Sequence, residues 1–140
     1  MRSTFELEQS IAIVSGPAYF DLHNCYDFVG YEYRPTERTL RFKWERSIGP
    51  WVPEDSPTSL SLLFEGVSNF AAKKRDDEMP FSEDDCVSDI SFLPRELSDQ
   101  FDAICLEHRS EDEHMLICFQ SGASVKIWAE SVTHEIQNGA

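Results

Sequence analysis

The chain has 140 residues, and 26 acidic side chains against 12 basic ones give it a formal net charge of −14. A surplus of this size repels phosphate backbones, so it argues against a nucleic-acid-binding protein. Apolar residues make up 41% of the chain, which is too many for a disordered acidic tail. We therefore expect one folded domain over residues 1–140.

The N-terminal segment, residues 3–14, fits two patterns. Phe5, Leu7 and Ile13 alternate with polar residues as in a strand. Leu7, Ile11 and Val14 also share one helical face, so a helix is the alternative. We favour the strand.

The clearest strand patterns are Tyr26–Arg34 and Thr39–Glu45, which a short turn-forming link joins. We predict that they form a β-hairpin, because apolar residues alternate on both sides of the link. The apolar residues that share a face are Val29, Tyr31 and Tyr33 in the first strand, and Leu40, Phe42 and Trp44 in the second.

Further alternating segments follow along the rest of the chain, and Pro94 before Arg95–Leu97 indicates one short helix. These strands are expected at Ser59–Phe64, Val67–Lys73, Val87–Leu93, Phe101–Arg109, His114–Gln120 and Ser124–Glu130. About eight short strands with turn signals between them predict a mainly β fold, either an antiparallel sandwich or a curled, barrel-like sheet.

Residues 74–85 form an irregular segment that carries much of the negative charge. Its carboxylates suit a basic protein partner, because they form charge-assisted hydrogen bonds with Arg and Lys. A solvated loop, partly neutralised by the basic residues at 73–75, is the alternative that composition slightly favours. Ca²⁺ binding is a weaker alternative, since the EF-hand spacing is missing. The candidate partner-binding residues are Asp76, Asp77, Glu78, Glu83, Asp84 and Asp85.

Trp51 lies in a second irregular segment, residues 47–58, between Pro50 and Pro53. Proline limits the freedom of the backbone, so this tryptophan is a candidate apolar anchor for a partner. The alternative, which we favour, is a lid that covers one end of the sandwich, because an exposed indole forgoes the gain from apolar burial.

Two side-chain pairs depend on the register of the expected strands near residues 101–120. If Arg109 pairs with His114, then Cys105 lies opposite Cys118, and His108 lies close to His114. We expect thiols rather than a disulfide, because the N-terminal residues lack the apolar core of a secretory signal and a cytoplasmic location is expected. Two histidines beside a hairpin tip are usually solvated, so we expect no metal site there.

The sequence has no catalytic or cofactor-binding motif, and we expect no cofactor. No apolar stretch is long enough to span a membrane as a helix. With so many acids in the chain, a pair suited to hydrolysis would arise by chance, so it carries no argument.

The motif Phe20–Cys25, the aromatic hairpin after it and Leu62–Val67 carry a resemblance over Tyr19–Phe70. In these residues the chain resembles small bacterial β-rich domains, some of them predicted immunity proteins of polymorphic toxin systems. The resemblance implies a binding role without catalysis.

We therefore expect a non-enzymatic, acidic protein that binds a basic protein partner, with immunity to a toxin as one instance. A carboxylate-using hydrolase or a ligand-binding β-barrel is the first alternative. An enclosed pocket that holds acids and histidines together would favour this alternative. A subunit that adds an edge strand to a homo-oligomer is the second alternative.

Overall fold

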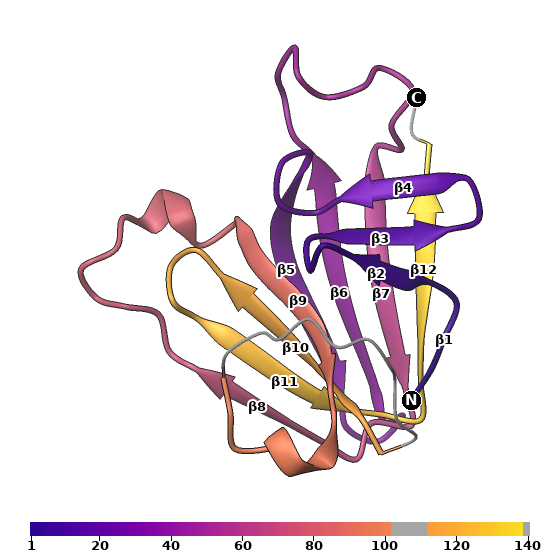
Figure 1. Ribbon diagram of the computed structural model, residues 1–140, viewed down its shortest axis with the longest axis vertical. Coiled ribbons are helices and arrows are strands. Elements are labelled where there is room, and N and C mark those ends of the chain that lie inside the picture. The colour runs from indigo at the N-terminus through magenta and orange to yellow at the C-terminus, as the bar shows by residue number, and fades with distance from the viewer. Residues whose placement is uncertain (102–111, 139–140) are drawn as a thin grey trace.

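The structure, a computed structural model, describes residues 1–101 and 112–138, which form three antiparallel sheets apart from one parallel pair (Figure 1). The largest sheet has the strand order β1-β12-β7-β6-β5, the second β8-β11-β10-β9 and the smallest β2-β3-β4. The strands are β1 (Arg2–Ser3), β2 (Glu6–Glu8), β3 (Ala12–Ser15), β4 (Ala18–Asp21), β5 (Tyr26–Arg34), β6 (Thr39–Arg46), β7 (Ser59–Glu65), β8 (Asn69–Lys73), β9 (Val87–Leu93), β10 (His114–Phe119), β11 (Ser124–Trp128) and β12 (Ser131–Gln137).

The predicted mainly β class is confirmed, and the sheets are open rather than closed into a barrel. The described residues hold more strands than the sequence indicated, because residues 2–21 are divided among four short strands and β12 is separate from β11. Residues 3–14 form strands rather than a helix, as we favoured, but a turn at residues 9–11 divides them into the antiparallel pair β2 and β3. The strand expected over residues 101–109 lies almost wholly outside the described residues.

The helical structure of residues 1–101 and 112–138 is confined to two 3₁₀ turns, η1 (Phe81–Glu83) and η2 (Arg95–Leu97). The second turn, η2, is the short helix predicted after Pro94. Within the described part of the chain, no helix is long and apolar enough to span a membrane.

The core lies on one face of the five-stranded sheet. Leu40, Phe42 and Trp44 of β6 are fully buried there, as their alternation predicted. Burial of each such side chain stabilises the fold by roughly 1.5–3 kcal/mol. The same cluster includes Ile13 from the three-stranded sheet and Ile117 from the four-stranded sheet, so two smaller sheets together cover one larger sheet.

A β-bulge interrupts the pairing of β5 with β6 between Phe28 and Gly30. Phe28 packs 4.9 Å from the ring of Phe119, and Tyr31 stacks 5.3 Å from the ring of Phe42. Residues three apart in a regular strand face opposite sides, so the extra residue brings both rings onto the core-facing side. Gly30 has φ = 141°, a conformation that other residues rarely adopt.

We predict that Gly30→Ala lowers the free energy of unfolding by about 1–3 kcal/mol, because an added Cβ makes this backbone conformation strained. Space is not the cause, since no atom lies within 4 Å of the position of that Cβ. Gly16→Asn is the control, because Gly16 has φ = 57°, where asparagine is tolerated. Equal urea midpoints for the two variants would contradict the role of the bulge.

Candidate functional site

The acidic segment connects β8 with β9, which are the two outer strands of the four-stranded sheet. It must therefore cross the whole end of that sheet, a distance of about 14 Å at three strand spacings. The turn between β10 and β11 supports it on the way. The Asp76 amide donates to the Ser121 carbonyl (2.7 Å), and the Gln120 amide donates to the Cys86 carbonyl (2.8 Å).

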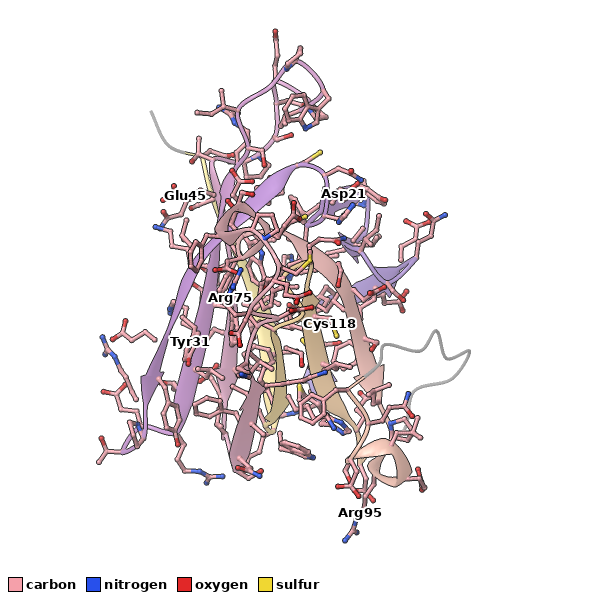
Figure 2. All side chains as sticks on the ribbon, turned by 90° about the vertical axis from the view of Figure 1, so that its left-hand side faces the viewer. Asp21, Tyr31, Glu45, Arg75, Arg95 and Cys118 are labelled. Carbon is pink, nitrogen blue, oxygen red and sulfur yellow. The ribbon has the colours of Figure 1, made fainter. Side chains whose placement is uncertain are left out.

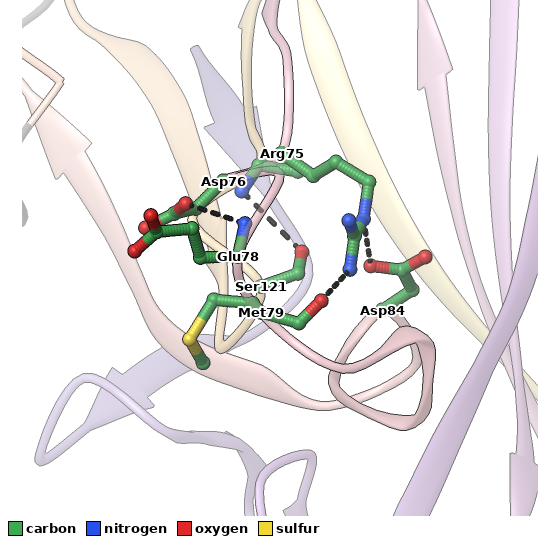
Figure 3. Close-up of polar contacts among 7 residues, drawn as sticks. Arg75, Asp76, Glu78, Met79, Asp84 and Ser121 are labelled. Carbon is green, nitrogen blue, oxygen red and sulfur yellow. Dashed lines mark hydrogen bonds and ion pairs between the residues drawn. The ribbon is translucent and has the colours of Figure 1, made fainter.

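Arg75 fixes the shape of this segment (Figure 3). Its Nε donates to Asp84 Oδ1 at 2.8 Å, and its Nη2 donates to the Met79 carbonyl at 2.6 Å. The guanidinium carbon also lies 4.6 Å from the centre of the Phe81 ring. One half-buried cation thus holds residues from both halves of the loop, and the loop has a defined conformation.

The six candidate carboxylates differ in whether they stabilise the loop or are exposed to solvent. Asp76 accepts a hydrogen bond from the Glu78 amide, and Asp84 is paired with Arg75, so these two carboxylates have structural roles. Asp77 has only an exposed ion pair with Lys74 (3.3 Å), which contributes little stability. Asp77, Glu78 and Asp85 are exposed, and Glu83 is half-buried in η1.

Asp85 lies where the acidic segment meets β5, because its carbonyl accepts a hydrogen bond from the Phe28 amide (2.8 Å). Partial burial raises the pKa of the Asp85 carboxyl, and the negative charge of Asp27 on β5 raises it further. The sequence analysis missed Asp27, which is distant in the chain and reaches this cluster only through the fold.

Trp51 is 62% exposed, so the lid that we favoured is wrong. Its ring lies over Gly49, where a Cβ would come within 2.1 Å of the indole, and its Nε1 donates to the Asn24 carbonyl at 2.8 Å. The indole is therefore held in one orientation with much of its surface in solvent. Ile48 beside it is 97% exposed.

The turn after β4 links Trp51 with the acidic segment. Asn24 accepts the bond from Trp51, and the preceding His23 lies 3.6 Å from the sulfur of Cys86, which follows Asp85. Figure 2 labels Asp21 at this turn and Arg75 in the acidic segment. The tertiary structure thus connects the two candidate surfaces, although they are distant in sequence.

Cys86 and His23 resemble a nucleophile with its base, but their geometry does not suit that role. His23 Nδ1 lies 2.6 Å from the Val87 carbonyl, which can only accept, so this nitrogen carries a proton and cannot take one from the thiol. Burial raises the pKa of the Cys86 thiol, and nearby carboxylates raise it further. A thiol in this setting is a poor nucleophile at neutral pH.

The register expected for the second pair of cysteines involves Cys105, which lies outside the described residues. Cys118 has Ser124 and Asp89 as its neighbours across the sheet. His114 is fully buried and stacks on Trp128 with ring centres 4.7 Å apart. The solvated position expected for His114 is therefore wrong, and His108, which we expected close to it, lies outside the described residues.

The described residues do not form an enclosed interior lined by acids and histidines. Apolar side chains fill the space between the sheets. An open groove of about 670 Å³ lies beside residues 47–58, and the residues that line it include Glu45 and Glu54 but no histidine. Within residues 1–101 and 112–138, no group of three or more His, Cys, Asp or Glu side chains could hold a metal ion.

No family model matches the chain, and no significant similarity to a curated protein or to a solved structure was found. The site must therefore be interpreted from its own geometry.

We predict that Arg75→Ala loosens the acidic segment, because both hydrogen bonds from the guanidinium are lost. Amide hydrogen exchange over residues 76–85 should become faster, and the free energy of unfolding should fall by about 1–2 kcal/mol. Lys74→Ala is the matched control and should change stability by less than about 0.5 kcal/mol. Equal exchange in the two variants would contradict the role of Arg75.

Because the pKa of Asp85 is raised, we predict that Asp85→Asn increases the free energy of unfolding by an amount that depends on pH. The folded state favours the protonated form of the Asp85 carboxyl. The stability that this group contributes is therefore lost as the pH rises above 3.8, the ordinary pKa of an aspartate, and through the higher pKa of the folded state. Asp85→Asn should be more stable than wild type at pH 7, and the difference should vanish near pH 3. Urea unfolding at both pH values checks this, and Asp55→Asn controls for the loss of one negative charge. A variant less stable than wild type at pH 7 would contradict the prediction.

Proposed function

We propose that the protein is a non-enzymatic binding protein whose acidic segment docks on a basic region of a partner protein. The single observation that supports this most is the fixed conformation of the segment. Arg75 and the β10–β11 turn hold it, so its exposed carboxylates lose little conformational freedom on binding. A basic partner would be attracted at long range by the net charge of −14.

Trp51 is the proposed apolar anchor for the same partner, and the turn after β4 connects it to the acidic segment. A tryptophan held by a hydrogen bond and by packing on Gly49 offers a large apolar surface with little remaining freedom. Inhibition of a toxin is one instance of this function, in which the carboxylates would cover a cationic active site. The scattered cysteines suit a reducing, cytoplasmic setting for such a protein.

The proposal is tested with two variants of equal net charge. The first reverses three exposed acids of the segment, Asp77→Lys, Glu78→Lys and Asp85→Lys. The control reverses three exposed acids on β2 and η2, namely Glu6→Lys, Glu8→Lys and Glu96→Lys.

Affinity capture from the native cell should recover the same basic protein with wild type and with the control, but not with the first variant. With the purified partner, the first variant should associate at least about tenfold more slowly, and its rate should depend less on salt. Equal association rates for the two variants would refute the electrostatic proposal.

The anchor role predicts that Trp51→Ala weakens binding of that partner by about 2 kcal/mol, mainly through faster dissociation. Tyr19→Ala is the control, because Tyr19 on β4 is also half exposed. Dissociation rates from surface plasmon resonance compare the two, and an unchanged rate for Trp51→Ala would remove Trp51 from the binding surface.

A further inference from the structure

β5 is the outer strand of the five-stranded sheet, and none of the other described strands pairs with its outer edge. The Phe28 amide is bonded to the Asp85 carbonyl, which occupies the first part of that edge. Beyond the bulge, residues 30–34 pair with β6 only, and no other described residue forms a backbone hydrogen bond with them. An edge of this kind is a template for one more strand.

Aromatic side chains beside this edge form a partly covered strip, which we define as Tyr31, Tyr33 and Phe70. Tyr31 and Tyr33 lie on the core-facing side of β5, opposite Phe42 and Leu40 of β6, yet they are 50% and 38% exposed. Phe70 of β8 contacts both tyrosines, with ring centres 6.1 Å and 4.7 Å apart. The second layer therefore reaches the strip with a single strand and leaves its outer part uncovered.

Charge is distributed unevenly along the edge. At the Tyr26 end, the negative charge of Asp27 raises the pKa of the Asp85 carboxyl, and Glu83 adds to the effect. At the other end, Arg34 lies 2.7 Å from Glu32 and 3.6 Å from Glu37, which offsets part of their charge. Figure 2 shows Tyr31 and Arg75 on the same side of the molecule, with Arg75 nearer the Asp21 end.

This distribution decides which occupant fits. A second copy of the chain would bring another net charge of −14 to the edge, so it is disfavoured by repulsion. A strand with basic residues at one end and alternating apolar residues along the rest complements both the acids and the aromatic strip.

We propose that an extended basic segment of the partner protein adds to the edge of β5 as an extra strand. Its apolar side chains would cover Tyr31, Tyr33 and Phe70, and its Lys or Arg side chains would lie beside Asp27, Glu83 and Asp85. This inference rests on the proposed function and deepens it, because it names the form in which the partner binds.

The test uses capped nine-residue peptides made of three lysines and six alternating valines and threonines, with a fluorescent label. One peptide carries the three lysines together at its N-terminus, and the other carries them at its first, fifth and ninth positions. Fluorescence anisotropy should show that the peptide with clustered lysines binds wild type at least tenfold more tightly, because the acids are concentrated at one end of the edge and a strand can add in either direction. Equal affinity of the two peptides would overturn the proposal.

Two N-methylated versions of the tighter peptide test the backbone pairing without any change in the protein. In a strand added to an edge, every second amide points to that edge. N-methylation of one alternate set should therefore abolish binding, and methylation of the other set should leave most of it. An equal effect of the two sets would overturn the strand pairing.

The side-chain strip is tested with the double variant Tyr31→Ala and Tyr33→Ala, for which Tyr19→Ala is the control. The double variant should bind the peptide at least tenfold more weakly, and circular dichroism checks that it is folded. If the double variant binds like wild type, while the triple variant Asp77→Lys, Glu78→Lys and Asp85→Lys loses binding, the edge proposal fails and the proposed function stands. If the triple variant keeps binding, the proposed function fails. A wild-type dimer that the tyrosine changes dissociate would assign the edge to a second copy and overturn the inference.

Discussion

The structure depends on one constraint, which is that a single apolar face of the five-stranded sheet must be covered by two smaller sheets. Leu40, Phe42 and Trp44 supply that face from β6, and its burial provides much of the driving force for folding. The three- and four-stranded sheets share the cover, and neither extends over the outer part of β5. The exposed tyrosines of β5 are a direct consequence, because their strand lies at the limit of the second layer.

The same arrangement accounts for the acidic segment. Since β8 and β9 are opposite edges of one sheet, the chain between them has to cross the end of that sheet. A long connection with many carboxylates would be expected to repel itself into an open conformation. Arg75 prevents this by pairing with Asp84 and the Met79 carbonyl at once. The carboxylates left exposed are therefore displayed on a defined support, which links the topology of the sheet to the proposed binding role.

Several features were predictable because they arise from neighbours in the chain. The alternation in Thr39–Glu45 identified buried residues correctly, and the β5–β6 hairpin followed from the short link between two alternating segments. Trp51 was not predictable in this way. Its exposure depends on the Asn24 carbonyl and on Gly49, and the contact with Asn24 exists only once the turn after β4 lies beside residues 47–58.

The sequence by itself determined the mainly β class, the residues of the main apolar face and the strong negative charge, because alternation and composition are local properties of the chain. Only the tertiary structure decided that Asp27 joins the acids of the 74–85 segment, that Arg75 organises that segment and that none of the other described strands pairs with the outer edge of β5. These features depend on which strands pair across long separations and on where the covering layer ends. Such choices follow from the burial of the whole apolar surface and not from any short segment of it.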